Sequence, residues 1–148
     1  MGVMVYKQLD FKSGGITFQL EFKSPIVSIG GDSGSGKSYL YKALDSKSIT
    51  GKLPNILCLN IKQKNLIDSI KNADHELIVI DNADLLLAQL DMELLEAIWG
   101  NPNNQYVIFS RMGSLFGIEP NNECELKQVD DVISLEYTEP WPEGVEFS

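Results

Sequence analysis

The succession of short apolar runs and helical segments is the strongest constraint on the fold of this chain. The predicted strands in its centre span residues 26–29, 56–61, 77–80 and 105–109. The segments of helical spacing after the first three of them span residues 38–44, 62–72 and 84–99. Short apolar strands that alternate with helices indicate a parallel sheet covered on both faces. We therefore expect an α/β domain with three layers and a mostly parallel sheet.

An antiparallel hairpin is expected in front of this sheet. Residues 3–9 and 16–22 alternate in the manner of strands and flank the turn-forming residues 12–15, Lys-Ser-Gly-Gly. Two further strands are predicted over residues 123–129 and 132–137. A length of 148 residues fits one domain. We predict a single domain over residues 1–138 and an acidic C-terminal tail over residues 139–148.

Composition excludes several classes of protein. The hydrophobic fraction of 43% and the charged fraction of 22% are ordinary for a globular domain. We expect no membrane span, since no apolar run approaches the roughly 18 residues that a span needs. We also expect no secretory signal, because residues 1–7 lack a charged head followed by an apolar stretch. Cys58 and Cys124 lack the spacing of a metal or redox motif. Cys58 is expected to be a buried free thiol, in a protein of the reducing cytoplasm.

The net charge of −9 is concentrated near the C-terminus. Residues 119–148 hold nine acids and one base, whereas residues 1–118 hold twelve acids and eleven bases. An acidic chain without a cluster of lysines and arginines is poorly suited to a phosphate backbone, so we expect no direct contact with nucleic acid. The acidic tail is interpreted as a solvated surface, and the alternative is a docking tail for a basic protein partner.

A glycine-rich segment between the first apolar run and the first helix predicts a phosphate-binding loop. It matches the pattern G-x-x-x-x-G-K-[ST] at Gly31, Asp32, Ser33, Gly34, Ser35, Gly36, Lys37 and Ser38. Glycines let the backbone wrap an anion, and the following helix N-terminus adds positive potential. Lys37 is expected to reach the β- and γ-phosphates, and the Ser38 hydroxyl to bind Mg²⁺.

The apolar run 77–80 ends in an acid, Asp81. Ligands of parallel α/β sheets gather at the carboxyl ends of the strands. We therefore expect Asp81 to accept a hydrogen bond from a magnesium-bound water beside Ser38.

In these two motifs the chain resembles the P-loop NTPases. Residues 31–38 are similar to their Walker A motif and residues 77–81 to their Walker B motif, within a resemblance that spans residues 26–111. It implies a three-layer P-loop NTPase fold and makes residues 1–138 a nucleotide-binding domain. Residues 105–109 with Ser110 resemble the strand that lies between the two Walker strands in the additional-strand branch, which includes AAA+ and ABC ATPases.

The resemblance assigns further site residues and also has gaps. Ser110 would face the γ-phosphate or the attacking water, or else only bond locally at the strand end. Arg111, the only arginine in the chain, follows Ser110 and would clamp phosphate in this site or in that of a neighbouring subunit, and the alternative is a lone arginine on the surface. Asn82 stands where that branch normally has a glutamate, so hydrolysis is expected to be slow or absent. Asp84 resembles the spaced acids of STAND-type ATPases and is also suited to cap the following helix.

An aromatic near the N-terminus stacks on adenine in ABC ATPases, and Tyr6 and Phe11 are the candidates here by position, with core packing as the alternative. We find no ABC signature in the sequence and expect no helical lid after residue 110.

The sequence thus predicts a cytoplasmic ATP-binding domain with Mg²⁺ and weak or partner-dependent ATPase activity. A small-molecule kinase of the uridine-kinase-like type is one alternative, although such enzymes need an arginine-bearing lid. The other is a non-hydrolysing nucleotide-dependent switch that docks a protein partner.

Overall fold

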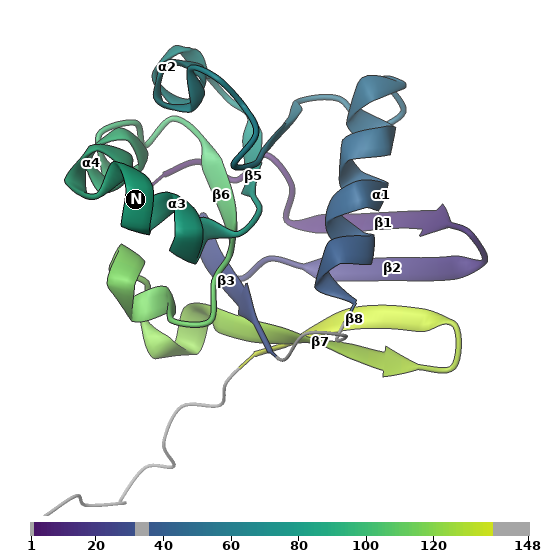
Figure 1. Cartoon of the computed structure of the whole chain (residues 1–148). Coiled ribbons are helices and arrows are strands. Elements are labelled where there is room, and N and C mark those ends of the chain that lie inside the picture. Colours follow the sequence, from purple (N-terminus) through teal and green to yellow (C-terminus); the bar gives the residue numbers. More distant parts are fainter. Residues whose placement is uncertain (1, 32–35, 138–148) are drawn as a thin grey trace, which may run out of the picture.

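All eight strands of the computed structural model, which describes residues 2–31 and 36–137, form one mixed sheet (Figure 1). The strands are β1 (Gln8–Ser13), β2 (Ile16–Glu21), β3 (Ile26–Gly30), β4 (Ile56–Leu59), β5 (Leu77–Ile80), β6 (Gln105–Phe109), β7 (Glu123–Val129) and β8 (Val132–Tyr137). Their spatial order is β1-β2-β8-β7-β3-β6-β5-β4.

Helices cover both faces of one half of this sheet. They are α1 (Lys37–Ile49), α2 (Leu66–Asn72), α3 (Ala83–Leu90) and α4 (Met92–Trp99). The core on one side joins Leu40 and Leu44 of α1 to strand residues such as Val27. The core on the other side packs α2, α3 and α4 against the alternate strand residues, such as Ile78 and Ile108. Two short 3₁₀ helices, η1 (Gly113–Phe116) and η2 (Pro120–Asn122), link β6 to β7.

The half formed by β3, β6, β5 and β4 is parallel throughout. Every residue of β5 and of β6 is buried, because each face of the strands meets one of the two cores. β6 lies between β3 and β5, so the strands that precede residues 31, 81 and 110 are neighbours. The residues that follow these strands therefore lie close together, at the carboxyl ends of the strands.

The other half consists of two hairpins. β1 pairs with β2 and β7 pairs with β8, both antiparallel, while β2 and β8 join in parallel. Gly14 and Gly15 make the first turn with positive φ angles of 57° and 83°, a conformation that glycine adopts without strain. This half curls around α1 (Figure 1), whose core includes Phe18 and Leu20 of β2.

The expected three-layer P-loop NTPase fold is wrong. Eight strands outnumber four α-helices among the described residues, and four of the strands belong to the two antiparallel pairs. The sheet is mixed and curled. On the face that packs against α1, strands of the hairpin half cover the core where a three-layer fold would have further helices. The physical reason is that residues 123–137 form a second hairpin, whose short turn allows only antiparallel pairing. The predicted N-terminal hairpin itself is present.

Several predicted elements differ in their bounds: the strand over 56–61 ends at Leu59, the helix over 62–72 begins at Leu66, and the helix over 38–44 spans Lys37–Ile49. The helix over 84–99 is interrupted at Asp91, whose φ of 51° and ψ of −134° are not helical. The first strand of the hairpin is β1 rather than residues 3–9, so that Lys12 and Ser13 belong to the strand and not to the turn. The predicted ends of β5, β6, β7 and β8 are confirmed.

No helix in residues 2–31 and 36–137 combines the length and the apolar character required to cross a membrane. The predicted tail over residues 139–148 lies outside the described residues.

Candidate functional site

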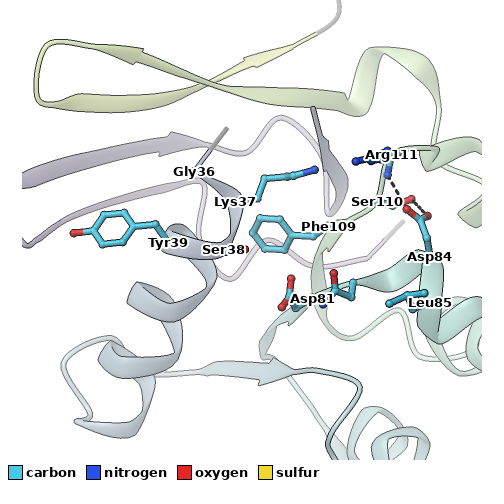
Figure 2. A pocket seen from close by; sticks show the side chains of 11 residues that line it. Gly36, Lys37, Ser38, Tyr39, Asp81, Asp84, Leu85, Phe109, Ser110 and Arg111 are labelled. Carbon is cyan, nitrogen blue, oxygen red and sulfur yellow. Dashed lines mark hydrogen bonds between the residues drawn. The ribbon is translucent and has the colours of Figure 1, made fainter. Parts of the chain in front are cut away.

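A pocket of about 720 Å³ lies at the carboxyl ends of the parallel strands (Figure 2). It brings together predicted site residues from separate parts of the sequence. Its lining residues are Gly36, Lys37, Ser38, Tyr39, Asp81, Asn82, Asp84, Leu85, Phe109, Ser110 and Arg111. The predicted residues Asp32, Ser33, Gly34 and Ser35 lie outside the described residues. Parallel strands bring these distant positions together because their carboxyl ends share one edge.

The two ends of the glycine-rich segment are described. Gly31 follows β3 with a φ of 108°, and Gly36 precedes α1 with a φ of 98°, conformations that favour glycine. The Lys37 ammonium donates a hydrogen bond of 2.6 Å to the Gly31 carbonyl oxygen. Among the described residues no side chain makes a capping hydrogen bond at the start of α1, and a helix N-terminus is a place where N–H groups can bind an anion.

Asp81 follows β5 and contributes its carboxylate to the pocket near Ser38 (Figure 2). Its backbone N–H donates to the Leu59 carbonyl of the neighbouring strand, which fixes the position. Burial raises the pKa of the Asp81 carboxyl, while the Asn82 N–H and the Lys37 charge oppose that shift. A carboxylate beside a hydroxyl offers oxygen ligands of the kind that divalent cations take, whereas the neighbouring ammonium opposes a cation unless an anionic ligand is bound as well.

Asp84 and Ser110 form a hydrogen-bonded pair across α3 and β6. The Ser110 hydroxyl donates to Asp84 Oδ1 at 2.6 Å, and the Arg111 N–H donates to Asp84 Oδ2 at 3.1 Å. Ser110 Oγ also accepts the Met112 N–H at 3.1 Å, and Ser110 is 3% exposed. The hydroxyl proton of Ser110 is therefore directed at Asp84 and not into the pocket.

Asn82 makes the turn between β5 and α3. It precedes the helix with a φ of 48° and a ψ of 46°, the left-handed region that asparagine tolerates better than most residues. The residue is thus suited to the backbone of this turn as well as to the edge of the pocket. The capping role predicted for Asp84 is wrong, because α3 begins at Ala83 and its N-cap position is Asn82, whose side chain makes no capping hydrogen bond among the described residues.

The Arg111 guanidinium points across the pocket toward the Lys37 ammonium (Figure 2). The salt bridges between described residues are His75–Asp74 and Lys127–Glu136, and they include neither cation. Two like charges directed at the same space repel each other unless an anion lies between them. The carboxylates of Asp81 and Asp84 line the same pocket, so the two cations can attract an anion but are partly balanced by two acids.

Sequence reasoning missed Tyr39, Leu85 and Phe109 as lining residues. Tyr39 directly follows the glycine-rich motif, and this position is the sequence signal that indicates it as a lining residue. The two aromatics that were predicted instead have other contacts. The Tyr6 hydroxyl donates to the Pro54 carbonyl near the amino end of β4, at the sheet edge opposite the pocket. Phe11 stacks on Phe18 with ring centroids 4.8 Å apart and adds to the core.

The cysteines do not contribute to this site. Cys58 and Cys124 are buried free thiols, and burial raises the pKa of each to about 12. No cluster of histidine, cysteine and acidic residues that could hold a metal ion occurs in residues 2–31 and 36–137. A magnesium ion here would rely on Ser38, Asp81 and the ligand's own phosphates.

Comparison with protein-family models, with curated proteins and with solved structures gives no match. The resemblance to P-loop NTPases therefore rests on the sequence motifs alone.

Proposed function

We propose that this chain binds ATP with Mg²⁺ in the pocket at the carboxyl ends of β3, β5 and β6. The observation that carries the proposal is the convergence of Lys37 and Arg111 on one space at the start of α1, where the described residues provide no side-chain cap. A triphosphate there would be bound by both cations and by the N–H groups of the glycine-rich segment. Ser38 and Asp81 would bind the metal ion either directly or through a water bound to the metal.

The strand order adds support. The strand that ends in Ser110 lies between the strands that end in the glycine-rich motif and in Asp81. This is the neighbourhood that the resemblance to AAA+ and ABC ATPases implies for a polar residue near the γ-phosphate. The curled, mixed sheet departs from the architecture of those proteins, so the proposal depends on the pocket and not on the whole fold.

Hydrolysis is proposed to be weak or dependent on a partner. Asn82 has an amide that orients water but accepts no proton from it. Asp84 is the carboxylate that could act as a base, and both its oxygens already accept hydrogen bonds from Ser110 and Arg111. A base held in this way needs a rearrangement before it can activate water.

The same observations favour a second function, that of a nucleotide-dependent switch that binds ATP without hydrolysing it. The bound triphosphate would then stabilise one conformation of the pocket, and a protein partner would bind that state. A small-molecule kinase is less favoured, because Arg111 is the only arginine in the chain and such enzymes use several.

The test is incubation of the full chain with Mg²⁺ and each nucleoside triphosphate, with measurement of both bound nucleotide and released phosphate. Retention of ATP with slow phosphate release supports a weak ATPase. Retention of intact ATP over many hours supports the switch, and release of ADP only when a nucleoside or metabolite is added supports the kinase. Absence of retention for every triphosphate contradicts the proposal.

A further inference from the structure

Tyr39 is an aromatic side chain held at the edge of the pocket. It follows Lys37 by two residues, lines the pocket and is 39% exposed. Phe18 packs against one side of its ring, with centroids 5.9 Å apart and planes 38° apart. The Tyr39 hydroxyl donates a hydrogen bond of 2.7 Å to the Ser13 carbonyl of β1. The ring is thus fixed by the hairpin although it is not buried.

The turn between β1 and β2 lies close to the Tyr39 hydroxyl. A Cβ added to Gly14 would lie 2.5 Å from the Tyr39 hydroxyl oxygen, a distance that requires one of them to move. Gly14 also has a φ of 57°. Glycine at this position therefore permits both the turn and the bond that holds Tyr39.

The charged groups of the pocket lie on one side of the helix start, and Tyr39 lies on the other (Figure 2). Asp81, Asp84 and Arg111 face the end where a γ-phosphate would be placed. A triphosphate bound there along the start of α1 would extend its other end away from these groups. That direction leads past Ser38 to the ring of Tyr39.

We propose that Tyr39 is the platform on which the base of the bound nucleotide stacks. This inference rests on the proposed binding of a nucleoside triphosphate and adds the residue that recognises its base. Stacking uses the face that every base offers, so it distinguishes large from small bases and not one purine from another. ATP and GTP are expected to bind within about threefold of each other, and the smaller pyrimidine triphosphates about tenfold more weakly.

The test compares Mg²⁺-ATP with Mg²⁺-tripolyphosphate, which has the phosphates without a base, by calorimetry on the full chain. Tyr39→Leu is expected to weaken ATP binding about tenfold and to leave tripolyphosphate binding unchanged. Tyr39→Phe keeps the ring and should retain ATP binding within about threefold. Gly14→Ala places a Cβ 2.5 Å from the hydroxyl oxygen, so the ring itself must move, and this variant is expected to weaken ATP binding selectively. Tyr6→Leu, at the opposite edge of the sheet, is the matched control and should match the original chain.

The outcomes separate the two proposals. If the original chain binds tripolyphosphate as tightly as ATP, or if Tyr39→Leu weakens both ligands equally or neither, the stacking role is overturned while the phosphate site stands. If the original chain binds neither ligand, the proposed function fails and the role of Tyr39 fails with it.

Discussion

The two halves of the sheet differ in how their strands are covered. The pocket lies at the ends of the strands that are covered on both faces. In the parallel half, β5 and β6 are buried at every residue and end at the pocket. In the hairpin half, exposed residues alternate with buried or half-buried ones along β1, and β7 has one buried residue and ends in three exposed ones. Strands covered on both faces leave their ends as the places where polar side chains can meet a ligand. The hairpin half instead supports the pocket from the side, through the contact of Ser13 with Tyr39.

The largest difference between the halves is expected in stability. Ile78→Ala removes a side chain that is 0% exposed in β5 and should lower the free energy of unfolding by about 3 kcal/mol. Val129→Ala, at the 57% exposed end of β7, should change it by less than about 0.5 kcal/mol. Urea unfolding of both variants measures the two changes in the free energy of unfolding. Equal losses of stability would contradict the expected difference between the two halves.

The next effect concerns the link between α3 and the end of β6. Ser110→Ala and Asp84→Ala should each lower the free energy of unfolding by about 1–2 kcal/mol, because a hydrogen bond to a carboxylate is lost. Since the two residues share that bond, the double variant should cost less than the sum of the single variants. Strict additivity in a double-mutant cycle would show that the bond contributes nothing.

A smaller effect is expected at the turn after β5. Asn82→Glu places a residue that is poorly suited to a φ of 48° and should destabilise the chain by about 1 kcal/mol. Asn82→Gly, which suits that angle, serves as the control and should retain or raise the melting temperature. If the glutamate variant is as stable as the original chain, the left-handed turn does not constrain this position.

The smallest effect is a pH-dependent one at Asp81. Burial raises the pKa of this carboxyl in the folded chain, so the folded state binds its proton more tightly than the unfolded state does. The contribution of Asp81 to stability therefore falls as pH rises from the ordinary value of 3.8 through the raised pKa. Asp81→Asn should be slightly more stable than the original chain at pH 7, and the gain should vanish below that range. Chemical unfolding at a series of pH values tests the sign, and a gain that grows toward low pH would contradict it.

The sequence predicts the ends of β5 and β6 because their apolar residues run without interruption between turn-forming residues. It also predicts that Lys37, Asp81 and Ser110 approach one another, since each follows or begins an element of a parallel arrangement. The curl of the sheet could not be predicted in this way. It depends on the pairing of β2 with β8, residues more than a hundred positions apart, for which local periodicity contains no signal.

The break at Asp91 and the role of Tyr39 escaped prediction for related reasons. Apolar spacing continues from α3 into α4, so the periodicity indicates one helix although the backbone turns at Asp91. The ring of Tyr39 is placed by Phe18 and Ser13 of the hairpin. Contacts of this kind between distant segments are set by tertiary structure and not by the residues on either side.

The most direct test of the central claim is calorimetry of Mg²⁺-ATP binding to the original chain and to Lys37→Ala. Lys37 is half-buried, and the carbonyl that it contacts belongs to the glycine-rich segment, so its removal should leave the fold intact and abolish measurable binding. Lys42→Ala, on the same helix and exposed, is the matched control and should bind as the original chain does. Unchanged ATP affinity in Lys37→Ala would contradict the proposal that this pocket binds a nucleoside triphosphate.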